Sequence, residues 1–390
     1  MPIGYLVTVT LIAVCTLSAL IPPRRPRLLA VAGFRLGLAI NELPAVAFVW
    51  LLASTLLAFA QGDIATAGGW SVFGLAVLTA CGLAVIAWRG ARTGAAVDRA
   101  LDRGLGPGWR DAIDPRLAAG LRDGIPLGRA LLAPFSVRRH DVEKTADIAY
   151  GPAGERNLLD LYRPRSGAPT GPTLIHLHGG GFTGGRKDHQ ALPLLYRLAG
   201  QGWVCVSANY RLRPEAGFPD HLVDYKKVIA WVREHGREYG ADPSQIFAAG
   251  TSAGGHMAAM AGLTPGDPRF QPGFEHVDTS VSAVICLNAY YGPLDDGKEV
   301  PSSPEACIRR DAPPVFIAHG DSDTLVPVED VRRFAERLAL TSSAPTVYAE
   351  LPGAQHAFDL FSSPRFETVV NAVEAFTAWV RSTQTETRGR

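Results

Sequence analysis

The chain contains few cysteines. Five are scattered over 390 residues, and none forms a Cys-x-x-Cys pair or a cysteine and histidine cluster with zinc-site spacing. Two of them, Cys15 and Cys81, lie within long apolar stretches. The sequence therefore indicates neither a disulfide framework nor a zinc site.

The chain also lacks a surplus of charge of either sign. Its formal net charge is +1, which gives no electrostatic reason to expect a nucleic-acid partner. The glycine-rich stretch at residues 179–185 lacks the spacing of a dinucleotide fingerprint and the Lys-Ser/Thr ending of a phosphate-binding loop. We therefore expect no nucleic acid and no cofactor.

One pentapeptide has the pattern of an activated serine. Gly250-Thr251-Ser252-Ala253-Gly254 is a G-x-S-x-G sequence, whose glycines let a strand turn sharply into a helix with the serine at the apex. The apolar residues 245–249 predict the strand, and the small residues 253–263 predict the helix. Backbone amides at a helix N-terminus favour developing negative charge. The pattern predicts Ser252 as a nucleophile.

A second glycine motif lies upstream. His178-Gly179-Gly180-Gly181 follows a β-type run at residues 173–177, so the glycines open a loop at the end of a strand. Such a loop supplies one amide of an oxyanion hole, and the residue after the nucleophile, Ala253, supplies the other. We expect His178 to brace this loop through hydrogen bonds.

A serine hydroxyl is a poor nucleophile at neutral pH and needs a histidine base oriented by a carboxylate. The chain has ten histidines, and their positions distinguish them. His356 lies in a loop after the last predicted strand and is the predicted base. His176 and His319 lie in or at the end of predicted strands, and His256 lies on the predicted helix after the serine. These three are predicted to be structural.

The orienting carboxylate has two candidates. Asp321 and Asp323 both lie in the acidic loop that follows the apolar strand at residues 314–319. Asp321 comes directly after Gly320 and could instead cap the following turn through its side-chain oxygen. We therefore predict that Asp323 orients His356.

Residues 150–380 resemble a known family. They look like the HGGG-bearing branch of the α/β-hydrolase superfamily, similar to hormone-sensitive-lipase-like carboxylesterases and feruloyl-esterase-like enzymes. The segments that carry the resemblance are Leu159-Asp160-Leu161-Tyr162-Arg163-Pro164, His178-Gly179-Gly180-Gly181-Phe182, Asn209-Tyr210-Arg211-Leu212, Phe218-Pro219, Gly250-Thr251-Ser252-Ala253-Gly254-Gly255 and His319-Gly320-Asp321-Ser322-Asp323. The resemblance implies Ser252 as nucleophile, Asp323 as acid, His356 as base, and Gly179, Gly180 and Ala253 as oxyanion donors.

Two positions depart from the family pattern. Thr251 stands where many relatives carry an acidic residue, and the acid lies in Asp323-Thr324-Leu325 rather than in Asp-Pro-Leu. The predicted activity is that of a serine carboxylesterase or lipase acting on lipophilic or acyl esters. An acyltransferase, an amide or formamide hydrolase, and a non-catalytic binding module remain alternatives. The sequence leaves the oligomeric state open.

The carboxyl-terminal part alternates between strand-like and helix-like runs. Further strands are predicted at residues 203–208, 281–287 and 346–351, and helices at 221–236, 328–340 and 365–382. This alternation favours a mostly parallel sheet flanked by helices, that is, an α/β-hydrolase domain at residues 143–390.

The amino-terminal part, residues 1–103, has a different composition. Residues 3–21, 43–60 and 70–88 are uncharged apolar stretches about long enough to cross a bilayer. They predict a transmembrane helical region of about three spans, with residues 28–40 as an interfacial piece or an extension of the second span. No Lys or Arg precedes the first stretch, so we expect a retained span rather than a signal peptide.

Arginines follow the first and the last of these stretches, whereas residues 61–69 between the other two contain none. The positive-inside rule then predicts a multi-pass protein of the cell membrane with the hydrolase domain in the cytoplasm. Residues 104–142 are rich in Gly, Pro and Arg. We expect them to form a linker, or a cap segment that covers the active-site entrance.

Overall fold

Eight strands form one sheet in the computed structural model, which describes residues 3–122, 124–128, 134–135, 137–166, 170–294 and 300–388, the last four by backbone alone. The strand order is β1-β2-β4-β3-β5-β6-β7-β8. β1 and β2 run antiparallel to their neighbours, and the other strands pair in parallel. The strands are β1 (Val142–Ala149), β2 (Leu158–Pro164), β3 (Gly171–Leu177), β4 (Val204–Ala208), β5 (Ala241–Thr251), β6 (Ala283–Leu287), β7 (Val315–Gly320) and β8 (Thr346–Leu351).

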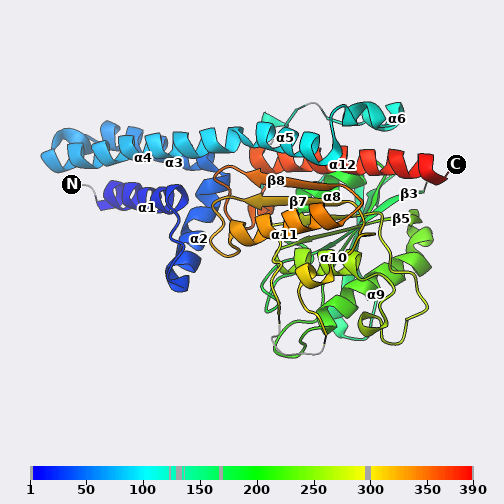
Figure 1. Cartoon of the computed structure of the whole chain (residues 1–390). Coiled ribbons are helices and arrows are strands. Elements are labelled where there is room, and N and C mark those ends of the chain that lie inside the picture. The colour runs from blue at the N-terminus through cyan, green and yellow to red at the C-terminus, as the bar shows by residue number, and fades with distance from the viewer. Residues whose placement is uncertain are drawn as a thin grey trace.

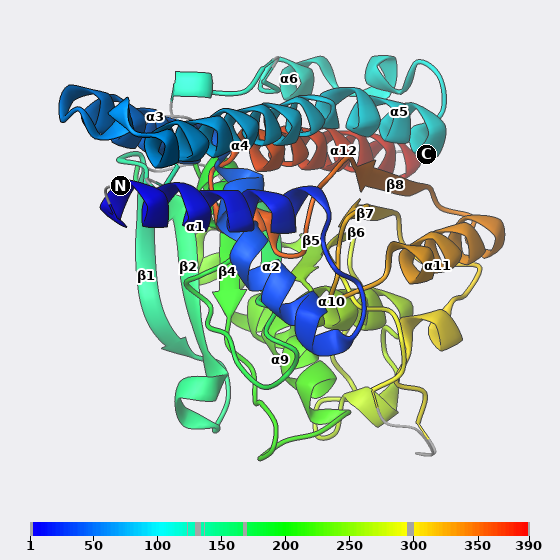
Figure 2. The same ribbon diagram turned by 90° about the vertical axis from the view of Figure 1, so that its left-hand side faces the viewer.

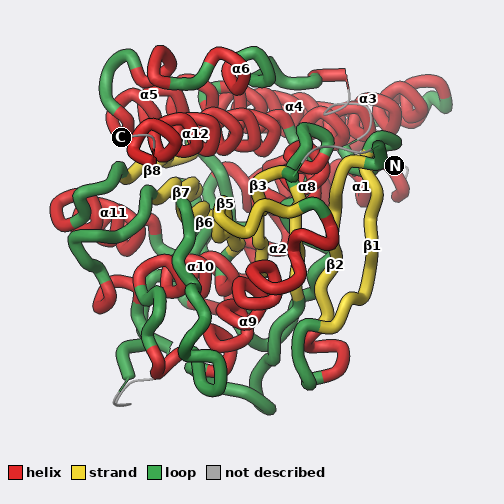
Figure 3. The backbone as a smooth tube through the Cα atoms, turned by 90° about the vertical axis from the view of Figure 1, so that its right-hand side faces the viewer, coloured by secondary structure: helices red, strands yellow, loops and turns green. Residues whose placement is uncertain are grey.

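The parallel strands are apolar on both faces because helices cover the sheet on both sides (Figure 1). The first layer consists of α9 (Asp220–His235), α10 (Ala253–Leu263) and α11 (Val328–Thr341). The second consists of α5 (Thr93–Leu105), α8 (Leu192–Ala199) and α12 (Pro364–Arg388). Figure 3 shows the strands between these two layers. The fold class predicted from the sequence is confirmed.

Most of α5 lies before residue 104, yet this helix belongs to the core of the hydrolase domain. Its side chains Val97 and Leu101 are 3% and 2% exposed and pack in one apolar cluster with Val347 of β8 and residues of α12. The boundary predicted at residue 103 falls within α5, which packs against the sheet, and it stays a prediction.

Three of the four other long N-terminal helices form one apolar cluster beside the hydrolase domain (Figure 1). They are α1 (Ile3–Leu20), α3 (Pro44–Ala60) and α4 (Ala67–Ala91). Among the described residues, two helical stretches are long and apolar enough to cross a membrane: α1, and α4 together with α5. The number becomes three if α3 and the helix before it, α2 (Arg27–Glu42), count as one bent span, but these two helices meet at 85°.

α2 joins the N-terminal helices to the hydrolase domain. Glu42, at its end, forms a buried ion pair with Arg365 at the start of α12, and it accepts a 2.7 Å hydrogen bond from Ser363 Oγ. A buried ion pair is stable only when both partners are present and well hydrogen-bonded. This pair therefore ties α2 to α12.

Most of the predicted strands and helices are present within a few residues of their expected bounds. The strand at 346–351 and the helix at 253–263 coincide with β8 and α10. The predicted cap at residues 104–142 lies partly outside the described residues, at 123, 129–133 and 136. In its described part, Trp109 and Ile113 pack in the cluster of α12, on the second helix layer.

The placement of α5 leads to a stability prediction. Leu101→Ala removes a side chain buried against the sheet and is expected to lower the free energy of unfolding by about 2–5 kcal/mol. Leu340→Ala on α11 is the matched control, because Leu340 is 82% exposed and its truncation should cost less than about 0.5 kcal/mol. Thermal unfolding of the purified variants measures both changes. Equal melting temperatures for the two variants would contradict a core position for α5.

Candidate active site

Ser252 lies between β5 and α10 in a strained conformation. Its φ is +54° and its ψ is −114°, outside the regions that non-glycine residues normally occupy. The turn is possible because the chain comes very close to β3: a Cβ on Gly254 would lie 1.9 Å from the carbonyl oxygen of Leu177. The Ser252 amide also donates a 2.8 Å hydrogen bond to Leu287 O at the end of β6. The result is a half-buried serine at the carboxyl edge of the sheet.

The predicted base and acid lie in line with this serine. His356 Nε2 is 2.9 Å from Ser252 Oγ, and His356 Nδ1 is 2.6 Å from Asp323 Oδ2. Asp323 follows β7 and His356 follows β8, so the ends of neighbouring parallel strands bring the two together. The three side chains form one hydrogen-bonded chain from carboxylate to hydroxyl.

Asp321, the competing acid, has a different set of contacts. Its Oδ1 accepts hydrogen bonds from the Gly353 amide at 2.8 Å and from Ser322 Oγ at 2.9 Å, which ties the two loops together. Asp323 Oδ1, in contrast, accepts from the amides of Leu325 and Val326, and this leaves Oδ2 directed at His356. The geometry thus favours Asp323 as the orienting carboxylate.

The charges of the pair stabilise each other. Burial acts to lower the pKa of His356, but the carboxylates of Asp323 and Asp359 outweigh it and hold the pKa above the ordinary value of 6.5. Burial acts to raise the pKa of Asp323, and His356 beside it reverses this and lowers the pKa. Asp323 is therefore ionised at neutral pH and favours a proton on His356.

The predicted oxyanion amides differ in how they are used. The Gly179 amide donates a 2.6 Å hydrogen bond to Gln190 Oε1, so this amide is engaged by the protein itself, which differs from the prediction. Within the part of the chain that the structure describes, the amides of Gly180 and Ala253 have no acceptor. Gly179 still lies against Ser252, since a Cβ there would be 2.9 Å from Ser252 Cβ. Gly180 and Ala253 therefore remain the predicted oxyanion donors.

His178 braces the glycine loop, as its position predicts. Its Nδ1 is 2.6 Å from the Gly179 carbonyl oxygen, and its ring stacks on Tyr210 with centroids 4.5 Å apart. Burial lowers the pKa of His178 to about 4, so the ring is neutral and Nδ1 carries the donated hydrogen. Tyr210 in turn donates a hydrogen bond to His178 O at 3.1 Å.

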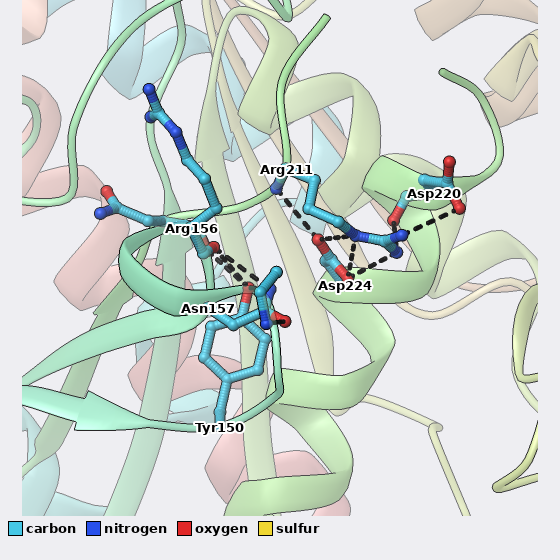
Figure 4. A network of polar contacts seen from close by, with 8 residues as sticks. Tyr150, Arg156, Asn157, Arg211, Asp220 and Asp224 are labelled. Carbon is cyan, nitrogen blue, oxygen red and sulfur yellow. Dashed lines mark hydrogen bonds and ion pairs between the residues drawn. The ribbon is translucent and has the colours of Figure 1, made fainter. Parts of the chain in front are cut away.

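A polar network fixes the segment that carries Tyr210. Figure 4 shows Arg211 hydrogen-bonded to Asp224 and Asp220 of α9, and Tyr150 bonded to Asn157. Asp224 is fully buried and accepts from both the backbone and the guanidinium of Arg211. These bonds fix Arg211, and Arg211 in turn fixes the adjacent Tyr210, which supports the glycine loop.

The three histidines that were predicted to be structural all have partners within the protein. His256 Nε2 lies 2.9 Å from Ser302 O, His319 Nε2 lies 3.1 Å from Val326 O, and His176 Nε2 lies 3.1 Å from Thr251 Oγ1. All three are fully buried, and burial lowers the pKa of each. They are neutral and do not contact Ser252 Oγ.

An N-terminal helix reaches the site, which the sequence did not predict. Phe34 of α2 makes an edge contact with the His356 ring, with centroids 5.9 Å apart. Thr324 Oγ1 donates to Ala30 O at 3.1 Å, beside Asp323. Figure 2 shows α2 crossing in front of the strands on the side of the N-terminal helices. The loops after β7 and β8, which carry Asp323 and His356, thus face α2.

Two family matches cover the hydrolase domain. Residues 159–298 match the BD-FAE family, and residues 275–386 match the dienelactone hydrolase family.

Similar proteins cover more of the chain. The probable carboxylic ester hydrolase LipM of Mycobacterium tuberculosis is 38% identical, over 98% of this chain and 94% of the relative. Esterase LipQ of the same organism is 37% identical, over 74% of this chain and 75% of the relative. Among solved structures, Thermogutta terrifontis esterase 2 is 30% identical over 57% of this chain and 86% of its own, with a TM-score of 0.49.

The similarity to LipM spans the N-terminal helices as well as the loops that carry Ser252, Asp323 and His356. Together with the fold, it shows that the chain belongs to the hormone-sensitive-lipase-like carboxylic ester hydrolases of the α/β-hydrolase superfamily.

Proposed function

We propose that this ester hydrolase is a membrane-anchored serine carboxylesterase in which Ser252 is the nucleophile, His356 the base and Asp323 the orienting acid. The observation that carries the proposal is the continuous hydrogen-bonded chain from Asp323 through His356 to Ser252 Oγ. A serine held in this way becomes nucleophilic at the moment its proton passes to the imidazole. The substrates are lipophilic or acyl esters.

The reaction proceeds in two halves. His356 Nε2 takes the proton from Ser252 Oγ as that oxygen attacks the ester carbonyl carbon, and the amides of Gly180 and Ala253 donate hydrogen bonds to the resulting oxyanion. The tetrahedral intermediate collapses, the carbon–oxygen bond to the alcohol breaks, and the alcohol leaves with the proton from His356. Water, deprotonated by the same histidine, then attacks the acyl carbon. The bond to Ser252 Oγ breaks, the acid leaves, and His356 returns the proton to Ser252 Oγ.

The position of α2 supports a lipophilic substrate supplied from a bilayer. α2 stands at 85° to α3, so it would lie along the membrane surface if α1, α3 and α4 cross the membrane. Its outer face exposes Leu28 and Leu29, 84% and 54%, next to Arg27. Apolar side chains bordered by arginine are typical of interfacial helices. Because α2 also touches His356, the catalytic edge would face the lipid surface.

The proposed triad is tested by substitution. Ser252→Ala should lower kcat by about a millionfold, and Asp323→Asn by about ten thousandfold, because the first removes the nucleophile and the second leaves the histidine misoriented. Turnover of a p-nitrophenyl ester and labelling by a fluorophosphonate probe measure both losses in detergent-solubilised protein.

Asp321→Asn is the matched control for the acid, since an asparagine oxygen can still accept from Gly353 and Ser322. It is expected to retain most of the activity. A Ser252→Ala variant that is labelled like wild type, or an Asp321→Asn variant that loses more than Asp323→Asn, would overturn the assignment.

The raised pKa of His356 predicts the pH profile. The base must be neutral to accept the serine proton, so kcat/KM should increase with pH through an apparent pKa above 6.5 and then level off. Initial rates with a p-nitrophenyl ester, corrected for spontaneous hydrolysis, give this curve. An apparent pKa below 6.5 would mean that Asp323 does not stabilise the imidazolium.

The proposed orientation can be tested in living cells. With three spans and the arginine-rich segments inside, a fluorescent protein fused to the C-terminus should fold and fluoresce, whereas alkaline phosphatase fused there should be inactive. Insertion of alkaline phosphatase after Gly62, in the loop between α3 and α4, is the control and should give an active enzyme. The reverse pattern would place the hydrolase domain outside the cell.

A further inference from the structure

A second buried carboxylate lies close to the triad. Asp359 is three residues after His356 and is fully buried. In the described chain no Lys or Arg pairs with it, whereas the buried Asp160 pairs with Lys144 and Lys187. Burying a carboxylate without a cation costs folding free energy, so residues of this kind occur preferentially where a reaction uses them.

Asp359 binds the residue directly before the nucleophile. Its Oδ2 accepts a 2.6 Å hydrogen bond from Thr251 Oγ1, and its Oδ1 lies 3.4 Å from Asn288 Nδ2. Thr251 has a single hydroxyl hydrogen and gives it to Asp359, so it must accept from His176 Nε2 at 3.1 Å. Burial lowers the pKa of His176 to about 3, which leaves this ring neutral.

These bonds connect the segment that carries Ser252 with the segment that carries His356. Thr251 ends β5, and the next residue is the strained Ser252. Asp359 and His356 belong to the same short loop after β8. The bond from Thr251 to Asp359 therefore fastens the loop of the base to the turn of the nucleophile, across the 2.9 Å gap between His356 Nε2 and Ser252 Oγ.

The charge of Asp359 also acts on His356. It raises the pKa of the histidine, together with Asp323, whereas burial alone would lower it. The other titratable groups near this histidine are His319, which is neutral through burial, and the hydroxyl of Ser252. A negative charge here favours the imidazolium that forms as Ser252 attacks.

Resting on the proposed function, we propose that Asp359 is a positioning residue of the ester hydrolysis: it holds the Ser252 turn through Thr251, and its carboxylate adds to that of Asp323 in stabilising protonated His356. Burial raises the pKa of Asp359 to about 6, so its charge is present at neutral pH and is lost as the pH falls through that value. Because the folded-state pKa is raised, the ionised form weakens the fold at neutral pH. Its presence there favours a role in the reaction.

The test uses Asp359→Asn in the full-length protein, since asparagine keeps the size and can still accept from Thr251. The expected result is a decrease in kcat of about tenfold to a hundredfold with little change in KM, because protonated His356 loses a neighbouring negative charge. The acidic limb of the kcat/KM profile should move to lower pH, because the histidine loses a neighbouring negative charge. The melting temperature should not fall.

Three further variants make the result decisive. Thr251→Val detaches the carboxylate from the turn and should lower kcat, while Thr251→Ser keeps the hydroxyl and should behave like wild type. Asp160→Asn removes a buried carboxylate outside the site and should lower the melting temperature without moving the acidic limb.

The inference is overturned if Asp359→Asn keeps the wild-type kcat and acidic limb, whatever its melting temperature. If Asp359→Asn does not fold, Thr251→Val decides instead, and wild-type turnover in that variant overturns the inference. Failure of the proposed function itself is recognised separately, by wild-type protein that neither turns over esters nor reacts with the fluorophosphonate probe.

Discussion

The backbone of Ser252 is held in a conformation that costs free energy, and the neighbouring strands keep it there. A non-glycine residue in such a region costs about 1–3 kcal/mol and persists only where its surroundings impose the conformation. Here Gly254 lies directly against the end of β3, and the Ser252 amide is bound by the end of β6. β5 lies between these two strands in the sheet. The strand order thus makes the turn possible, and the turn fixes the position of Ser252 Oγ relative to the rest of the site.

The parts of the site that are local in sequence could be predicted from the sequence. A G-x-S-x-G turn and an H-G-G-G loop have their own backbone requirements, and the strands around them are apolar runs, so the positions of Ser252, Asp323 and His356 followed from chain order. The first two strands and α8 were not predicted. For β1 the reason is that the strand is only half buried and its side chains do not form a clear apolar pattern.

The remaining contacts depend on which segments meet in space. Gln190, in a loop with no motif of its own, accepts the hydrogen bond of the Gly179 amide. Asp359 binds Thr251 although the two are more than a hundred residues apart in the sequence. Phe34 touches His356 from a helix that the sequence assigned only to the membrane region. A single sequence does not encode such pairings in any local period or composition. The departure at Thr251 was the one visible signal that its surroundings are unusual.

α4 continues into α5 with almost no interruption, so that residues Ala67–Leu105 form one helical stretch of 39 residues whose far end is packed into the hydrolase core. A helix without a flexible linker transmits its orientation along its length. If α4 crosses the bilayer as we propose, the hydrolase domain cannot tumble freely above the lipids, and Ser252 stays at a fixed height over them. Encounters with substrate would then occur by lateral diffusion in two dimensions, so the rate would depend on the surface density of the ester rather than on its concentration in water.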